Sequence, residues 1–361
     1  MHALGTTLLV PVWRLPQTGI GDSAERDEET MYRYILTRVL IMIPTLFVIS
    51  IISFALIELP PGDYLSSYID RLMQSGQDAT RDLVQNLRIR YGLDKPVHVR
   101  YLKWMGGVLQ GDFGYSFLYN RPVSQLIGER LALTIFVTFT TLIFTWVLAI
   151  PIGIYAAVRQ YSPTDYVFTF IGFIGLATPN FMLALILMYL GYKLFGFNVG
   201  GLFSMEYATA PWSWAKFVDM LEHLWVPVVV IGTAGTAGMI RVMRANMLDE
   251  IRKPYVTTAR AKGLPPWKVI LKYPVRVAMN PFVSTIGWLL PSLVSGATIT
   301  AIVLSLPTTG PLLLEALRNQ DMYLAGSFLM FLAALTVVGT LLSDILLAWI
   351  DPRIRYGARG R

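Results

Sequence analysis

The sequence predicts an all-α polytopic membrane protein with six transmembrane helices and a periplasmic cap between the first and second helices. Of the 361 residues, 54% are hydrophobic and only 15% are charged, and the mean hydropathy is +0.53. Soluble domains contain about 25% charged residues. Here the few charges lie in polar stretches that separate long apolar runs, which is the pattern of a chain that crosses a membrane repeatedly.

Six apolar runs are long enough to supply the roughly 20 helical residues that a hydrocarbon core requires. They are residues 39–59, 131–158, 166–195, 223–247, 278–304 and 326–350. Helix-weakening residues occur within them, among them Pro44, Pro151, Pro179, Pro227 and Pro291. Membrane helices tolerate proline where neighbouring helices satisfy the freed carbonyls, so we expect bent helices around a pathway.

The distribution of Lys and Arg predicts the orientation. Residues 241–276 contain nine basic side chains against two acids, Asp249 and Glu250, whereas residues 197–222 and 305–325 are net acidic. Cytoplasmic loops carry an excess of Lys and Arg, so the loop 248–276, the tail 351–361 and both termini are predicted to be cytoplasmic. The net charge of +7 follows from these loops and needs no nucleic-acid partner.

The remaining segments are assigned by their composition. Residues 1–30 combine a short apolar run with a polar stretch, so we expect a disordered leader or a start-site artefact before a first helix at 31–59. Residues 60–130 contain a helical patch at 82–91 and several aromatic residues, which predicts a small periplasmic cap. Residues 131–350 would form a five-helix core.

The cytoplasmic loop contains signals for a short exposed helix. Polar residues from Asp249 can start a helix, Pro254 suits a first turn, and Gly263 followed by two prolines ends it. Such a helix presents a small surface with basic edges, suited to a cleft on another protein; the expected residues are Tyr255, Thr258, Ala259 and Lys262. The alternative is a basic loop held at anionic lipid headgroups.

The run Thr257-Thr-Ala-Arg-Ala-Lys-Gly263 resembles the coupling-loop motif of binding-protein-dependent ABC importer permeases, in particular the oligopeptide, dipeptide and nickel permease family. Gly263 matches the motif glycine and Ala259 the last alanine of its Glu-Ala-Ala triplet, while Thr257 and Thr258 replace the first two positions. Three further segments extend the resemblance in the same order: Pro61-Gly-Asp, Gly111-Asp-Phe-Gly and Asp351-Pro-Arg-Ile-Arg.

This resemblance implies the ABC importer permease fold and a subunit that forms half of a solute pathway in the bacterial or archaeal cytoplasmic (inner) membrane. The implied partners are a second homologous permease, two cytoplasmic ATPase subunits and a periplasmic solute-binding protein, besides membrane lipid. The residues expected to couple to the ATPase are Tyr255, Thr258, Ala259, Arg260, Lys262 and Gly263. The expected pathway-lining residues are polar positions on the fifth helix, Ser292, Ser295, Thr298 and Thr300.

One departure bears on the solute. Peptide-handling relatives often carry a glutamate where this chain has Ala301, and a glycine where it has Thr308. Because this carboxylate is absent near the outer pathway, the expected solutes include a neutral oligosaccharide as well as a peptide.

Other chemistries lack their residues. There is no phosphate-binding loop, so ATP and Mg are expected only in partner ATPase subunits. There is no cysteine, and the three histidines are far apart, so neither a catalytic residue nor a metal site is predicted.

The alternative to an ABC importer permease is a stand-alone channel or an ion-coupled secondary transporter. Of the few charges within the spans, Arg244 lies near an end where it can snorkel, and Asp344 alone is a candidate carrier carboxylate, for which helix packing is the favoured role.

Overall fold

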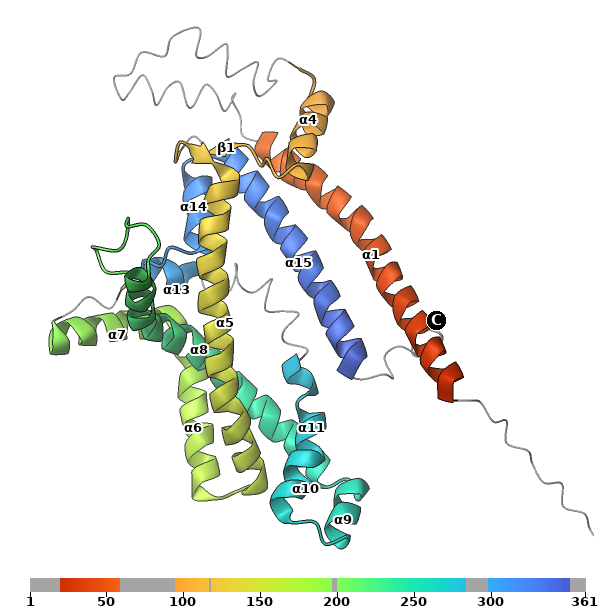
Figure 1. The fold of residues 1–361 in the computed structure, drawn as a ribbon. Helices are drawn as coiled ribbons and strands as arrows, with labels where there is room; N and C mark the ends of the chain where they lie inside the picture. Colours follow the sequence, from red (N-terminus) through yellow and green to blue (C-terminus); the bar gives the residue numbers. More distant parts are fainter. Residues whose placement is uncertain (1–19, 59–94, 117, 197–199, 284–297, 351–361) are drawn as a thin grey trace, which may run out of the picture.

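The computed structural model describes residues 20–58, 95–116, 118–196, 200–283 and 298–350. These residues are helical apart from turns, connecting loops and one short hairpin (Figure 1). In chain order the elements are α1 (Ile20–Glu58), α4 (Val97–Leu109), β1 (Tyr115–Ser116), β2 (Arg121–Pro122), α5 (Val123–Val158), α6 (Pro163–Ala177), α7 (Asn180–Phe195), α8 (Trp214–Ile251), α9 (Pro254–Ala261), α10 (Pro266–Lys272), α11 (Pro274–Ala278), α13 (Thr298–Val303), α14 (Thr309–Arg318) and α15 (Met322–Ile350).

The two long helices α5 and α8 form the centre of the molecule, with α6 packed beside them (Figure 1). Small residues allow the close approach: a Cβ at Gly153 would lie 2.5 Å from the Cβ of Met243, and one at Gly232 would lie 2.8 Å from the ring of Phe144. Packing through small residues is the usual basis of helix association in membranes, where the lipid is as apolar as leucine. The α5–α8 pair is therefore built for tight contact.

Helices α1 and α15 form a second pair, which diverges from α5 and α8 toward one end of the molecule (Figure 1). A Cβ at Gly326 would lie 2.2 Å from the side chain of Ile57, so the two helices meet closely there. Further along, Arg38 Nε lies 3.2 Å from Asp344 Oδ2. This ion pair joins the two helices and agrees with the packing role predicted for Asp344.

Among the described residues, four helices are long and apolar enough to cross a membrane, or five if one bent pair counts as a single span. The predicted span 166–195, for which a bent helix was expected, is divided into α6 and α7, which meet at an angle of 96°. The cause is local: Pro179 has no N–H for a continuing helix and forces Thr178 into an extended conformation, with φ −86° and ψ 115°. Most of the predicted span 278–304 lies outside the described residues.

The cap and leader boundaries also differ from the predictions. Helix α1 begins at Ile20, so residues 20–30 are helical, where the expectation was a disordered leader or a start-site artefact through residue 30. Helix α5 begins at Val123, because the β1–β2 hairpin ends at Pro122 and turns the chain directly into the helix, so residues 123–130 belong to α5 and not to the cap. The patch 82–91 and the tail 351–361 lie outside the described residues.

Helix α4, in the segment predicted to form a cap, packs on the ends of α1 and α15. Trp104 of α4 lies 5.7 Å from the ring of Phe54, and Arg100 of α4 lies 2.8 Å from Glu58 at the end of α1.

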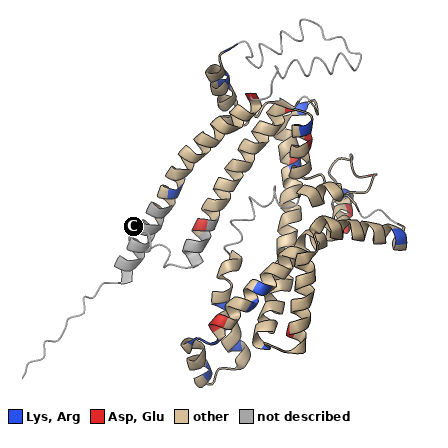
Figure 2. Ribbon diagram, turned by 180° about the vertical axis from the view of Figure 1, so that it is seen from behind, with Lys and Arg blue, Asp and Glu red and all other residues tan. Residues whose placement is uncertain are grey.

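Charged residues gather mainly toward the two ends of the helices, and the middles carry few (Figure 2). We call the end that holds α4 and the hairpin the α4 end, and the end that holds α9, α10 and α11 the α9 end.

Candidate functional site

The α9 end carries the short helix that the sequence predicts, with one difference at its start. Helix α8 continues through Asp249 and Glu250 to Ile251, so these residues do not begin the short helix. The break falls at Lys253, which Pro254 holds in an extended conformation with φ −69° and ψ 147°. Pro254 then occupies the first turn of α9, as predicted, and Gly263 follows its end with φ +73°.

The outer surface of α9 contains five of the six expected coupling residues. Tyr255, Thr258, Arg260, Lys262 and Gly263 are exposed. The prediction that Ala259 belongs to this surface is wrong, because its side chain is only 3% exposed. It packs in a small apolar cluster with Val256 of α9 and Val269 of α10, so its small size serves the contact between these two helices.

Tyr255 connects α9 to its neighbours. Its hydroxyl donates a hydrogen bond to the Glu250 carboxylate at the end of α8, and its ring lies 6.3 Å from that of Tyr273, between α10 and α11. Burial, and then the hydrogen bond and charge of Glu250, raise the pKa of Tyr255 to about 12. The hydroxyl therefore stays protonated at neutral pH and keeps donating to Glu250.

Helices α10 and α11 attach this unit to the long helices. One apolar cluster buries Met243 and Met247 of α8, Ala149 of α5, Ala278 at the end of α11, and Phe282, which follows α11. The ring of Phe282 lies 6.0 Å from that of Trp146 on α5. Direct packing therefore connects the α9 end to both α5 and α8.

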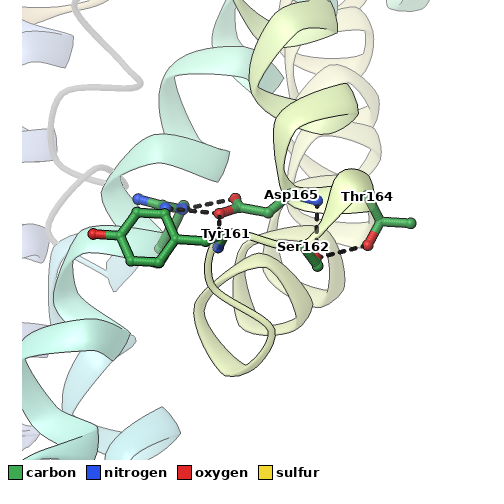
Figure 3. A network of polar contacts seen from close by, with 5 residues as sticks. Tyr161, Ser162, Thr164 and Asp165 are labelled. Atoms are coloured by element: carbon green, nitrogen blue, oxygen red, sulfur yellow. Dashed lines mark hydrogen bonds and ion pairs between the residues drawn. The ribbon is translucent and has the colours of Figure 1, made fainter.

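An ion pair extends this connection to α6 (Figure 3). Arg244 of α8 donates from Nε to Asp165 Oδ1 at 2.9 Å and from a terminal nitrogen to Oδ2 at 2.8 Å. Asp165 also accepts from the Tyr161 backbone N–H, and its own N–H donates to Ser162 Oγ. Sequence reasoning expected Arg244 to reach the membrane surface and overlooked Asp165; the available signal was the capping pattern of Ser162 and Asp165 at the start of α6.

Of the four expected pathway residues, the structure describes two: Thr298 is half-buried and Thr300 is buried. Ser292 and Ser295 lie outside the described residues. Thr298 packs against Gly310, where a Cβ would lie 2.5 Å from its Oγ1. Thr300 is 4% exposed and is buried within the chain.

Comparison with known proteins identifies the family to which this chain belongs. Residues 149–356 match the family described as the binding-protein-dependent transport system inner membrane component, and residues 31–138 match its N-terminal counterpart. The chain belongs to this family. The resemblance found in the loop motif is thereby confirmed, and the permease is a membrane component of a binding-protein-dependent ABC transporter.

The permease is similar over 90% of its length to several permease proteins. It is 37% identical over 328 residues to the oligopeptide transport system permease protein AppB of Bacillus subtilis (strain 168), which covers 90% of this chain and 100% of AppB. It is 31% identical over 326 residues to the glutathione transport system permease protein GsiC of Salmonella choleraesuis, with 90% and 100% covered. It is 29% identical over 340 residues to the dipeptide transport system permease protein DppB of Alkalihalophilus pseudofirmus, again with 90% and 100% covered. These relatives are permease subunits and not enzymes.

Proposed function

We propose that this permease forms half of the translocation pathway of an ABC importer for peptides. A second homologous permease forms the other half, two cytoplasmic ATPase subunits bind the α9 end, and a periplasmic binding protein delivers the solute to the α4 end. The names of AppB, GsiC and DppB support the peptide assignment, because their systems carry oligopeptides, glutathione and dipeptides.

The observation that carries the proposal is the exposed helix α9 and its attachment. Its surface offers Tyr255 and Thr258 beside the cations Arg260 and Lys262, and this surface fits a cleft on a partner protein. The buried contacts beneath it reach α8 through Tyr255 and α5 through Phe282. An ATPase that closes on Mg-ATP would push α9 and move both long helices together as rigid elements.

The burial of Ala301 reduces the support for an oligosaccharide as the solute. Ala301, which replaces the glutamate of peptide-handling relatives, is only 3% exposed and packs with Leu304 and Leu306. A carboxylate at this position would be largely buried, so its absence removes little charge from the accessible surface. A peptide therefore remains the better-supported solute.

The test is ATP-dependent uptake by the complete transporter in proteoliposomes. We expect labelled peptides to accumulate only with ATP, the ATPase subunits and the binding protein present, and vanadate to stop accumulation. Accumulation of an oligosaccharide but no peptide would correct the solute. Solute movement by the permease without ATPase subunits would instead support a channel or an ion-coupled carrier.

A separate experiment tests the role of α9 by reversing the two charges at its edge. The double change Arg260→Glu and Lys262→Glu should abolish copurification of the ATPase subunits, because like charges would face the same partner surface. The matched control is Arg318→Glu, which reverses an exposed charge on α14 at the other end of the molecule. Equal loss of the ATPase in the control would point to a folding defect.

A further inference from the structure

A cavity of about 300 Å³ lies at the α4 end, between α5 and the turn that leads into α14. Its polar wall contains Arg130 of α5, Glu315 of α14 and Tyr119 of the hairpin loop, together with Ser305 and Thr308. Its volume is at the small end of the range for ligand pockets, about 300–1,000 Å³. The cavity therefore suits a small molecule or one part of a larger one.

The walls of this cavity are fixed by buried contacts. One turn below Arg130, Thr134 Oγ1 accepts a hydrogen bond of 3.0 Å from the Thr309 N–H at the start of α14. Leu126 of α5 and Leu312 of α14 are buried in one apolar cluster. These contacts hold α14 against α5, so the helices that carry Arg130 and Glu315 are fixed relative to each other.

The two charged groups of the cavity differ in their partners. Glu315 accepts a hydrogen bond of 2.5 Å from the Tyr119 hydroxyl. Burial, and then this bond and the charge of Glu315, raise the pKa of Tyr119, so the hydroxyl remains a donor. Arg130 is half-buried, and within the part of the chain that the structure describes no hydrogen bond or ion pair engages its guanidinium. A half-buried guanidinium that forms no ion pair among the described residues can bind an anionic group of a ligand.

We propose that this cavity is a subsite for the free termini of a peptide, in which Arg130 binds the α-carboxylate and Glu315 binds the α-ammonium group. Arg recognises a carboxylate through two parallel hydrogen bonds, which gives direction as well as strength. The Tyr119 hydroxyl holds the Glu315 carboxylate toward the cavity. The subsite rests on the proposed function, since it presupposes a peptide on the pathway.

The test compares a free dipeptide with its C-amidated and N-acetylated forms in uptake by the complete transporter. In the Arg130→Gln variant, uptake of the free dipeptide should fall about tenfold, while uptake of the C-amidated form should change little. In the Glu315→Gln variant the same contrast should appear with the N-acetylated form. Because every variant receives solute from the same binding protein, the ratio between variants isolates the permease.

A second measurement removes the binding protein altogether. The purified permease complex is heated with each of the three peptides at millimolar concentration, and binding is detected as a saturable rise in Tm. We expect the free dipeptide to raise the Tm most, and this advantage over the amidated form to disappear in Arg130→Gln.

The controls use a surface ion pair at the same end. Arg121 lies 2.5 Å from Glu129, and neither residue lines the cavity. The variants Arg121→Gln and Glu129→Gln should leave both measurements unchanged. Equal loss of free and capped peptides in Arg130→Gln, or no rise in Tm with any peptide, would overturn the subsite. Failure of the wild-type transporter to take up any peptide would instead overturn the proposed function.

Discussion

The backbone conformation at position 263 favours glycine, whereas the space around it would admit a larger side chain. Its φ of +73° lies in the left-handed region, and no heavy atom lies within 4 Å of where a Cβ would stand. Left-handed conformations cost a non-glycine residue about 1–3 kcal/mol, least for Asn and most for β-branched residues. The residue follows the end of α9 and directs the chain into α10, so its conformation sets the angle between these two helices.

The Gly263→Val variant should therefore lose ATP-dependent uptake while the permease remains inserted in the membrane. The Gly263→Asn variant should keep a large part of the uptake, because Asn tolerates the left-handed conformation. Uptake by proteoliposomes, compared at equal amounts of inserted permease, measures both. Equal loss in the two variants would show that side-chain volume matters here, contrary to the geometry.

The Asp165–Arg244 pair predicts an asymmetry between its partners. The side chain of Asp165 is 3% exposed and that of Arg244 is 27% exposed. Arg244→Gln leaves a buried carboxylate without its counter-ion and should destabilise the permease by about 3 kcal/mol. Asp165→Asn leaves a cation that still reaches solvent and should cost about 1 kcal/mol. Thermal unfolding of the solubilised protein gives the order, and the reverse order would contradict the assigned burial.

At the scale of elements, the contact between α5 and α8 depends on glycine. A Cβ at position 153 would meet the Cβ of Met243 at 2.5 Å, a distance that requires the helices to separate. Gly153→Ala should therefore lower the stability of the permease by about 1–3 kcal/mol. Gly238 of α8 provides the control, since no heavy atom lies within 4 Å of its Cβ position.

The Gly238→Ala control should be neutral or should stabilise the permease by up to about 1 kcal/mol, because alanine favours the helix. Unfolding temperatures of both variants in the same detergent provide the measurement. If Gly153→Ala and Gly238→Ala lowered the unfolding temperature equally, the close contact between α5 and α8 would not explain the effect of Gly153→Ala.

The elements also show which features a sequence can reveal. Pro254 and Gly263 act on the backbone of their own neighbourhood, so the existence and end of α9 were predictable. The burial of Ala259 depends on Val269 of the next helix, and the partner of Arg244 lies 79 residues away. Contacts of this kind follow from the tertiary arrangement and leave no local periodicity. The sharp break at Pro179 was underestimated because many membrane helices accommodate proline by bending.

At the scale of the whole molecule, the apolar runs and the loop motif were sufficient to predict the class of protein and its family. They were insufficient to show that α5 and α8 are longer than a bilayer requires. Their 36 and 38 residues correspond to about 54 and 57 Å, against a hydrocarbon core of about 30 Å. Hydropathy marks only the apolar part of such a helix, so residues 123–130 of α5 were assigned to the cap, and residues 214–222 and 248–251 of α8 to loops.

The orientation of the chain can be tested with single cysteines, because the natural sequence contains none. A thiol introduced by Lys262→Cys on α9 should react with a membrane-impermeant maleimide only in inverted vesicles. A thiol introduced by Gln110→Cys, at the end of α4, should react only from the periplasmic side. Both positions are exposed, so access to the reagent depends on the side of the membrane. Labelling of Lys262→Cys from outside would reverse the proposed orientation.

The length of α8 has a mechanical consequence. A rod of about 57 Å that tilts by about 5° displaces its far end by about 5 Å, roughly the diameter of an extended chain. Because α9 follows α8 directly, we expect a small closing motion of a partner ATPase at α9 to change the width of the pathway on the other side of the bilayer. The expected displacement increases with the number of residues in α8.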